Sequence, residues 1–491
     1  MTGNKGLDGG QYRPLSNNDL EAIHTTSLRV FSEIGIRVKN EEALKLFAAA
    51  GAKVDQADLI VRIEPELVMD LIRKAPEKIV LFGRKPEHTL EVGGKKVFAG
   101  TGGSALYVMD PGSDDRRSAL LGDLKDIARV VDSLKNIHFF MLPIIPSDVP
   151  EGAIDVNRFS VALAYCSKHI IGGVYTVEGI SDVIRMAEMI VGSRQALTDK
   201  PIISMVTCCS ISPFVLDDKY SELTIEVARA GLPVVTPAEP LCGTTSPITL
   251  AGNLVVQNVD TLAGVMLAQL ANPGAPVFYG CISSIADMKD MKYLSGAVEM
   301  GLMNAAASQL AHYYRLPIYA TAGMTDSKTI DAQAGIESAI TTVMVSLAGG
   351  NFIHDAAGFL EFCMCASLEK YVLDDEILGM AMRAVEGIQV NADTLAFDVL
   401  KATKPGGHFV AARHTRKFMR KEQYKPALCD RDQREKWSGN GKKDLREKAQ
   451  MKVREILSTP EVPVIDTKIL EKIQKEIPGI KTDVFEDRGK W

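Results

Sequence analysis

From about residue 97 onward the sequence repeats one unit, a short apolar run followed by an amphipathic helical segment. Successive runs begin 31 to 43 residues apart, which is room for a strand, a helix and two loops. The runs are continuously apolar rather than alternating, as expected for parallel strands that helices cover. The predicted strands are VFAGTGG from Val97, HFFMLP from His138, HIIGGVY from His169, PIISMVTCC from Pro201, PVVTPAEP from Pro233, PVFYGCISS from Pro276, PIYATAGMTDSK from Pro317 and NFIHDAAG from Asn351.

Eight nearly even units predict an α/β fold closed into a (β/α)8 TIM barrel, since an open dinucleotide fold would carry a GxGxxG fingerprint. The GTGG at 100–103 is too short for one. We expect a barrel core over 97–365, an N-terminal extension of helices and short strands over 1–96, and a helical C-terminal extension over 366–491. Between Lys401 and Gln450 there are 15 Lys or Arg and 6 Asp or Glu, which fits either a solvated helical surface or a docking face for an acidic partner.

Composition narrows the class of protein. The net charge of −6 argues against nucleic acid as a partner. No uninterrupted apolar run reaches the roughly 18 residues of a membrane helix, and the polar start has no apolar signal core. We therefore expect a cytoplasmic protein that does not bind membranes, with its cysteines reduced and buried.

In a barrel of this kind, catalytic groups lie at the carboxyl-terminal ends of the strands. His169 begins its strand, so we expect it at the opposite end. The residues at the strand ends are rich in rings and hydroxyls and poor in bases. They are Thr101, Gly102, Gly103, Tyr107, Glu239, Thr244, Thr245, Phe278, Tyr279, Ser283, Met324, Thr325, Asp326, Gln333, His354 and Phe359.

Several of these residues also fit structural roles. Phe278 and Tyr279 suit a packed barrel interior, Asp326 suits a helix cap, and Glu239 suits a buried hydrogen-bonding group. Cys363-Met364-Cys365 and His354 could hold a metal, but FLEFCMCASLEK reads more naturally as an apolar helix with buried thiols, and we expect no metal site. No GxSxG elbow and no phosphate-binding loop occurs in the sequence.

Three long stretches, PIYATAGMTDSKTIDAQAGIES, PAEPLCGTTSPITLAGNL and NFIHDAAGFLE, resemble the trimethylamine methyltransferase family. The similarity runs along most of the chain, including GGHFVAARHTRKFMR. Archaeal trimethylamine-specific members contain pyrrolysine, whereas every residue here is standard. Met324 is expected at or beside that position. The chain thus resembles the non-pyrrolysine branch, which includes glycine betaine methyltransferases that act with a corrinoid protein.

The resemblance implies transfer of a methyl group from a quaternary amine, such as glycine betaine, to the Co(I) of a separate corrinoid protein. No tightly bound cofactor is implied. Helical surfaces such as LVVQNVDTLAGVMLAQLA leave room for a homo-oligomer. The best catalytic candidates are then Glu239, Asp326 and His354. The expected substrate-binding residues are Tyr107, Thr244, Thr245, Phe278, Tyr279, Met324, Gln333, His354 and Phe359.

Three alternatives stay open at this point. The chain could be a zinc-dependent corrinoid methyltransferase, or a non-catalytic barrel subunit that binds betaine. It could also be an unrelated barrel lyase that uses Glu239 and Asp326 with Mg²⁺.

Overall fold

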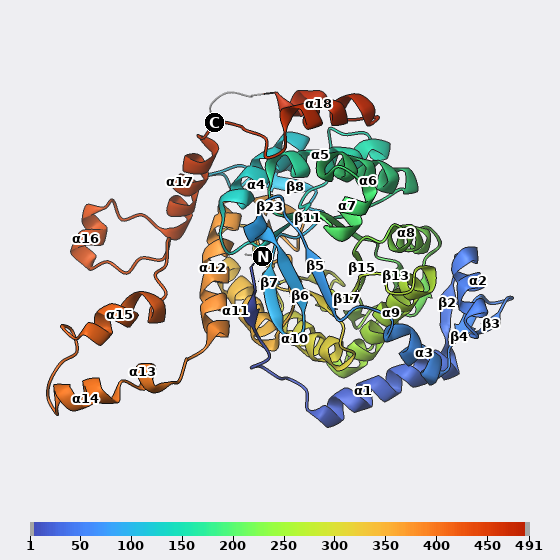
Figure 1. Ribbon diagram of the computed structural model, residues 1–491, viewed down its shortest axis with the longest axis horizontal. Helices are drawn as coiled ribbons and strands as arrows, with labels where there is room; N and C mark the ends of the chain where they lie inside the picture. Colours follow the sequence, from blue (N-terminus) through green and yellow to red (C-terminus); the bar gives the residue numbers. More distant parts are fainter. Residues whose placement is uncertain (1–3, 487–491) are drawn as a thin grey trace.

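The computed structural model describes residues 4–486, and its centre is a curled sheet surrounded by helices (Figure 1). Each apolar run singled out in the sequence contains one parallel strand of this sheet, so those strand predictions are confirmed. The strands are β7 (Lys96–Ala99), β10 (Phe139–Met141), β11 (His169–Gly173), β12 (Ile203–Val206), β15 (Val234–Ala238), β17 (Val277–Cys281), β20 (Ile318–Thr321) and β21 (Phe352–His354).

Within residues 4–486 the sheet has nine strands in the order β1-β7-β21-β20-β17-β15-β12-β11-β10. β1 (Leu7–Asp8) is antiparallel to β7, and the remaining neighbours pair in parallel. The sheet curls until β7 approaches β10, since Gly100 forms a parallel bridge with Phe139 and the His138 N–H donates to the Ala99 carbonyl at 2.7 Å. The protein therefore has a mixed α/β fold whose parallel strands all point their carboxyl ends to one edge.

Aromatic side chains fill the inside of the curled sheet. The Phe139 and Phe352 rings stack with centroids 3.6 Å apart, and Phe278 lies 5.4 Å from Phe352. A hairpin of β5 (Lys78–Leu81) and β6 (Leu90–Gly93) packs its apolar side chains against these rings. This hairpin lies across the amino-terminal ends of the strands, where the Phe82 N–H donates to the Pro201 carbonyl at 2.9 Å (Figure 1).

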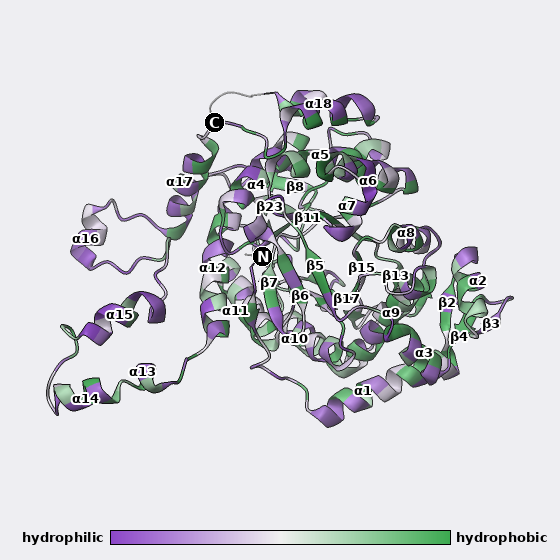
Figure 2. Ribbon diagram, viewed as in Figure 1, coloured by the Kyte–Doolittle hydropathy of each residue, from purple (hydrophilic) through white to green (hydrophobic). Residues whose placement is uncertain are grey.

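The helices around the sheet turn apolar faces inward and polar faces outward, as the colouring of α6 and α18 shows (Figure 2). The 22-residue α9 is apolar and long enough to cross a membrane, but 83% of its most apolar window is buried in the fold, as in a core helix. The helices are α4 (Leu121–Ser133), α5 (Ile154–Tyr165), α6 (Val177–Val191), α7 (Arg194–Asp199), α8 (Asp218–Arg229), α9 (Leu250–Ala271), α10 (Val298–Tyr313), α11 (Ala332–Ala348) and α12 (Leu368–Glu386).

The N-terminal segment contains helices and short strands that alternate along the chain. Ser16 caps the first helix, where its hydroxyl accepts the Asp19 N–H and the Asp19 carboxylate accepts the Ser16 N–H. These helices pack on α9. The elements are α1 (Asn17–Arg29), the π-helical turn η1 (Val30–Ile34), β2 (Ile36–Val38), α2 (Glu41–Ala49), β3 (Lys53–Asp55), β4 (Ile60–Arg62) and α3 (Pro65–Ile72).

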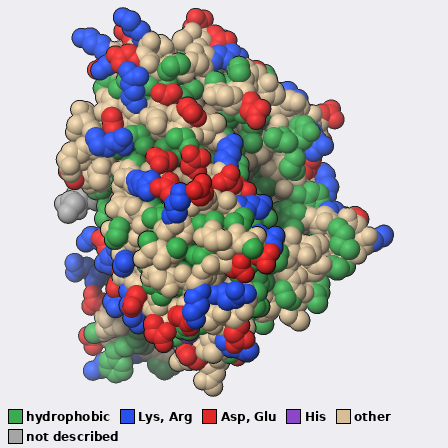
Figure 3. Space-filling view, turned by 90° about the vertical axis from the view of Figure 1, so that its right-hand side faces the viewer, with side chains coloured by type: hydrophobic (Ala, Val, Ile, Leu, Met, Phe, Trp, Pro, Cys, Tyr) green, Lys and Arg blue, Asp and Glu red, His purple; other side chains and the backbone are tan. Residues whose placement is uncertain are grey.

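The C-terminal segment is helical, and part of it stands away from the sheet (Figure 1). α17 packs on α4 and α12, and α18 packs on α6. Figure 3 shows the opposite side of the molecule, turned away from α13–α16, where basic and acidic side chains are intermingled. The helices are α13 (Ala392–Leu395), α14 (Phe397–Thr403), α15 (Arg413–Glu422), α16 (Arg434–Gly439), α17 (Leu445–Leu457) and α18 (Thr467–Glu476).

The segment FLEFCMCASLEK is not the helix that its apolar character predicts. It forms a hairpin of β22 (Phe359–Leu360) and β23 (Cys365–Ser367), and the helix begins only at Leu368. Glu361, Phe362 and Cys363 form the turn with φ of 52°, 59° and 67°, which a right-handed helix excludes. The prediction failed because β23 pairs with β8 (Tyr107–Met109), a partner that is distant in sequence.

Candidate active site

A cavity of about 640 Å³ opens at the carboxyl-terminal ends of the strands. Its wall includes the last residues of several strands or the residues directly after them. Because parallel strands end at one edge, these residues converge although they are far apart in sequence. They include Met141, Gly173, Val206, Glu239 and His354.

Aromatic rings line much of this cavity. The Tyr319 hydroxyl donates to the Met141 sulfur, 3.1 Å away. The Tyr319 ring stacks on the His354 imidazole, with the ring centroids 3.8 Å apart. Burial and the nearby charges of Glu239, Asp355 and Asp326 raise the pKa of Tyr293 well above its ordinary value, so its phenol stays neutral. The lining rings are Tyr175, Tyr220, Tyr293, Tyr319 and Phe362.

Glu239 is an acidic residue of the cavity wall whose carboxylate has no hydrogen-bond or ion-pair partner among residues 4–486. It follows β15 directly. The side chain is open to the cavity but otherwise enclosed by protein. Burial, and secondarily the charge of Asp355, raises the pKa of Glu239 to about 7. A carboxylate in this state gains from any cation that enters the cavity.

His354 and Asp355 form a second polar group in the wall. The His354 Nδ1 lies 3.0 Å from the Asp355 Oδ2, and its Nε2 faces the Thr321 hydroxyl. The Gly103 N–H donates to the Asp355 Oδ1 at 3.3 Å. A Cβ on Gly102 would lie 1.7 Å from that same oxygen, so glycine is required there. The imidazole orientation is thus set from both sides.

Asp326 lies behind the wall and holds part of it. Its Oδ1 accepts the Ser295 N–H at 2.7 Å, the Ser295 hydroxyl at 2.8 Å and the Gly296 N–H at 3.0 Å. These bonds tie down the segment that follows β19 (Tyr293–Leu294), whose Tyr293 lines the cavity. The cap of α11 is Asp331 instead of Asp326. Asp326 is therefore placed as a positioning residue.

Three other candidates taken from the sequence, Tyr279, Phe278 and Gln333, do not line the cavity. Tyr279 is fully buried against α9, where its one hydroxyl proton is shared between the Gln257 Oε1 and the Asn258 Oδ1, each 2.9 Å away. Its neighbour Phe278 packs inside the sheet. Gln333 donates to Glu337 at 2.9 Å, and the Glu337 carboxylate also accepts the Thr325 hydroxyl and the Asp326 N–H.

The remaining candidates have other neighbours. The Arg116 guanidinium lies 4.2 Å from the centroid of the Tyr107 ring. Thr244 and Thr245 belong to the turn after β16 (Leu241–Cys242), where Thr245 accepts the Leu241 N–H. Met324 and Phe359 are buried, and Phe359 packs against Gly102. The structure thus brings Glu239 and His354 together at the cavity and does not place these other side chains in its lining.

The residues predicted from the sequence include none of the five rings that line the cavity, which are Tyr175, Tyr220, Tyr293, Tyr319 and Phe362. Tyr175 follows β11 by two residues, so a search of every strand end would have found it. Tyr220 is on α8, and Tyr293 is on a short hairpin of β18 (Ser284–Ala286) and β19. No local pattern marks either of these two.

The eight cysteines are free, and they are not all buried as expected: Cys208 is exposed, and Cys363 and Cys429 are half-buried. Cys208 and Cys363 both line the cavity. Cys208 is exposed only to the cavity, where desolvation by the surrounding protein and the charge of Glu239 raise its pKa to about 12, so this thiol is protonated at neutral pH. Among residues 4–486, no group of three or more His, Cys, Asp or Glu side chains is placed to hold a metal ion.

Comparison with known proteins identifies the family. Residues 7–482 match the family described as Trimethylamine methyltransferase (MTTB). The chain is 37% identical to "Trimethylamine methyltransferase MttB" of Desulfitobacterium hafniense, over 98% of this chain and 96% of that protein. It is 33% identical to "Glycine betaine methyltransferase" of Desulfitobacterium hafniense, over 97% of this chain and 99% of that protein.

A further relative and a solved structure also match this chain. "Trimethylamine methyltransferase MttB" of Methanosarcina thermophila is 34% identical, over 96% of this chain and 99% of that protein. A solved structure titled "Crystal structure of the hydroxylamine MtmB complex" has a TM-score of 0.50 at 11% identity, covering 79% of this chain and 84% of that one, a likeness of fold alone. The match over nearly the whole chain shows that this protein belongs to the trimethylamine methyltransferase (MTTB) family.

Proposed function

We propose that this protein transfers a methyl group from a quaternary amine, glycine betaine or a related betaine, to the Co(I) of a separate corrinoid protein. The observation that carries the proposal is the cavity at the strand ends, where aromatic rings surround the unpaired carboxylate of Glu239. We also infer that the curled sheet is a (β/α)8 barrel, with the cavity at its mouth. The eight free thiols favour a reducing compartment, in keeping with the cytoplasm.

A tetraalkylammonium has no N–H to donate, so it is bound by ring faces and by charge. Each well-placed ring contributes roughly 0.5–2 kcal/mol. Tyr293 and Tyr319 offer neutral rings, and the charge of Glu239 complements the cation. Because methyl loss leaves a neutral tertiary amine, the leaving group needs no proton, which agrees with a cavity wall that is poor in bases. The chain's own contribution is binding, orientation and exclusion of water.

Tyr293, Asp326 and Glu239 have distinct roles in this proposal. Glu239 is the counter-charge, Tyr293 is a wall of the cation site, and Asp326 holds the segment that carries Tyr293. Both ring nitrogens of His354 face side chains of the chain itself, Asp355 and Thr321, so its role in this proposal is to support the Tyr319 ring that stacks on it. A betaine carboxylate would find Lys292 at the cavity wall, where it is paired with Asp287 and Asp290.

A second candidate substrate is protonated trimethylamine. The unpaired carboxylate of Glu239 favours it, because a trimethylammonium N–H can donate to that oxygen while a quaternary amine cannot. The two substrates share the cation site and differ in whether a hydrogen bond is used.

The test is a substrate panel with free cob(I)alamin as the acceptor, read as formation of methyl-Co(III) in the visible spectrum. The panel holds glycine betaine, choline, tetramethylammonium and trimethylamine. Conversion with a quaternary amine supports the proposal. Conversion with trimethylamine alone contradicts the quaternary substrate and supports the second candidate. The Glu239→Gln variant distinguishes enzyme-catalysed conversion from direct attack by free cobalt, which the variant would leave unchanged.

A further inference from the structure

A second cavity lies at the opposite end of the curled sheet from the candidate active site. Its volume is about 450 Å³, and it is formed by the loop between β5 and β6, by the chain before β1 and by Lys200 after α7. Figure 1 shows β5 and β6 across the sheet, and Asn4 forms a parallel bridge with Leu90 of β6. The apolar side chains inside the sheet run from this hairpin to Met141 and Val206 of the first cavity, and so separate the two cavities.

The wall of this second cavity is basic, although the chain is acidic overall. Its basic lining residues are Lys5, Arg84, Lys85 and Lys200. Among residues 4–486, the lining also contains one carboxylate, that of Glu91. Four basic and one acidic side chain give the lining a net charge of +3, whereas the whole chain carries −6. Glu91 is already paired with Lys78, whose Nζ lies 2.8 Å from its Oε1, so it does not compensate the four cations.

The lysines of this wall have few counter-charges. Within the described part of the chain, no ion pair or side-chain hydrogen bond is formed by Lys5 or Lys200. The Lys85 Nζ has an Asp132 oxygen 3.9 Å away, but that carboxylate also accepts the N–H and the hydroxyl of Ser167, both at 2.7 Å. Ammonium groups that share a cavity without compensating charge create a positive potential there, which attracts an anion.

Arg84 adds a positive charge that is buried and unsatisfied. All three of its guanidinium nitrogens are shielded from solvent and have no hydrogen-bond partner among residues 4–486. Burial lowers the pKa of Arg84 to about 10, so the guanidinium stays charged at neutral pH. A buried polar group without a partner costs free energy, and an unpaired charge costs more. An anion in the adjoining cavity offsets this cost.

Backbone hydrogen bonds fix the loop that carries these cations. The Arg84 N–H donates to the Ser167 carbonyl at 2.6 Å, and the His88 N–H donates to the Lys85 carbonyl at 3.0 Å. The chain before β1 is fixed to the same loop, because the Asn4 N–H donates to the Thr89 carbonyl at 3.0 Å. The cations are therefore presented in place before any ligand arrives, which lowers the cost of ordering on binding.

Part of the same wall is apolar. Val80, Phe82 and Pro86 line the cavity, and Val80 is 40% exposed. A bare inorganic anion would leave these side chains uncovered, whereas a ligand with a flat apolar body would cover them. The volume lies within the roughly 300–1,000 Å³ of small-molecule sites. Charge and shape together favour a small organic anion.

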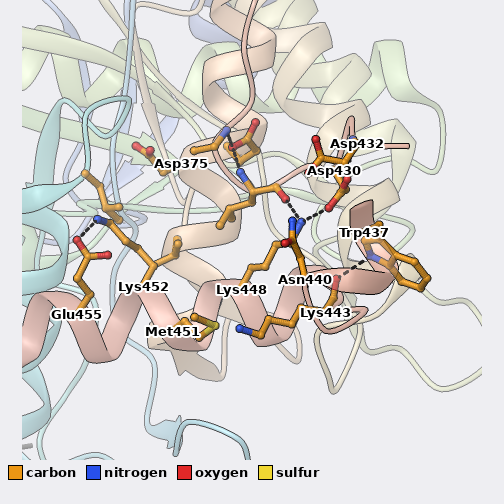
Figure 4. Close-up of a pocket in the computed structure, with 15 residues that line it drawn as sticks. Asp375, Asp430, Asp432, Trp437, Asn440, Lys443, Lys448, Met451, Lys452 and Glu455 are labelled. Atoms are coloured by element: carbon orange, nitrogen blue, oxygen red, sulfur yellow. Dashed lines mark hydrogen bonds and ion pairs between the residues drawn. The ribbon is translucent and has the colours of Figure 1, made fainter. Parts of the chain in front are cut away.

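The larger cavity beside α17 lacks such a bias (Figure 4). Two lysines of its wall are paired with carboxylates, Lys448 with Asp430 at 2.8 Å and Lys452 with Glu455 at 2.8 Å. Because positive and negative groups there satisfy one another, that wall favours no class of ion. The excess of unpaired positive charge distinguishes the cavity beside the β5–β6 loop.

We propose that the cavity beside the β5–β6 loop binds a small organic phosphate that carries a flat ring, such as a nucleoside monophosphate. The phosphate group lies among Lys5, Lys85 and Lys200, and the ring covers Phe82. A phosphate monoester carries a charge of about −1.5 to −2 at neutral pH, which suits a lining of several cations better than a single carboxylate does. The site is separate from the candidate active site and does not depend on the proposed methyl transfer.

The experiment is calorimetric titration of the full chain with adenosine monophosphate, phenyl phosphate, adenosine and inorganic phosphate. We expect both organic phosphates to bind at least tenfold more tightly than adenosine or inorganic phosphate. Lys5→Met and Lys200→Met should each weaken binding of adenosine monophosphate by roughly three- to tenfold. Lys39→Met, at an exposed lysine outside the cavity, is the matched control and should bind like the wild type.

Failure of both organic phosphates to bind would overturn the proposal. Inorganic phosphate or adenosine that binds as tightly as adenosine monophosphate would also contradict it, because one half of the ligand would then contribute nothing. Equal affinities in wild type, Lys5→Met and Lys200→Met would place the ligand elsewhere. Glu239→Gln should leave the affinity for adenosine monophosphate unchanged, and a change there would place the ligand in the candidate active site.

Arg84→Met tests the buried charge by thermal unfolding. Without ligand, this variant should unfold at a higher temperature than the wild type, because the unpaired guanidinium is gone. Adenosine monophosphate should then raise its unfolding temperature less than it raises that of the wild type. A variant that unfolds at a lower temperature and gains as much from the ligand as the wild type would contradict the role given to Arg84.

Discussion

Replacing Glu239 by glutamine removes the one unpaired charge of the cavity while keeping its size. A cation roughly 5–8 Å from the carboxylate, at an effective dielectric constant of about 20, is held by about 2–3 kcal/mol. Because the cavity is open to solvent, we expect the lower end of that range, a loss of roughly 30-fold in affinity at pH 8. Glu471→Gln, on the exposed face of α18, is the control and should bind like the wild type.

The pH dependence of binding tests the same carboxylate. Its pKa of about 7 in the free protein means that it binds a proton as the pH falls below 7. A permanent cation binds the ionised form, so wild-type affinity should decrease by up to about tenfold per pH unit below 7. The Glu239→Gln variant should show no such slope. Calorimetric titration with glycine betaine and tetramethylammonium between pH 5.5 and 8.5 measures both effects. A flat profile in the wild type, or equal affinities in the two proteins at pH 8, would refute the counter-charge role.

Three further predictions concern residues outside the cavity. Asp326→Ala should weaken quaternary amine binding about tenfold, because it releases the segment that carries Tyr293. Asp326→Asn should keep most of the wild-type affinity, and calorimetric titration measures both variants. Tyr279→Phe should lower the free energy of unfolding by about 1–3 kcal/mol with unchanged affinity, measured by urea unfolding, and a binding defect at normal stability would contradict its structural role. Burial raises the pKa of Asp260 to about 7, so the folded state loses stability as the pH rises from about 4 to 7. Between pH 4 and 8, the free energy of unfolding of Asp260→Asn should therefore rise by up to about 4 kcal/mol relative to that of the wild type. A difference between the two proteins that does not change with pH would contradict this.

The strands and their order along the chain could be predicted because their signal is local. A parallel strand covered by helices needs an unbroken apolar run, and the following helix needs its own periodicity and caps. Thus the runs from Val97 to Asn351 all contain strands of the sheet. The position of Glu239 and His354 at strand ends was also sufficient to predict that they lie at one edge.

The rings that line the cavity could not be predicted in this way. Phe278 and Tyr279 are adjacent in β17, and strand alternation sends one inside the sheet and the other against α9. Tyr220 and Tyr293 reach the cavity only because α8 and the β18–β19 hairpin fold over the strand ends. Which side of a strand faces inward depends on pairing register and curl, and both arise from contacts distant in sequence.

By itself, the sequence therefore determined the repeating unit, the edge at which a site forms and the family. The tertiary structure alone decided which rings line the cavity, that Asp326 supports the wall, and that α13, α14 and α15 stand away from the sheet without a buried residue. The physical reason is the same in each case. Strand and helix formation follows from the spacing of apolar residues along the chain, whereas a cavity wall or an uncovered surface is defined by what the rest of the chain places next to it.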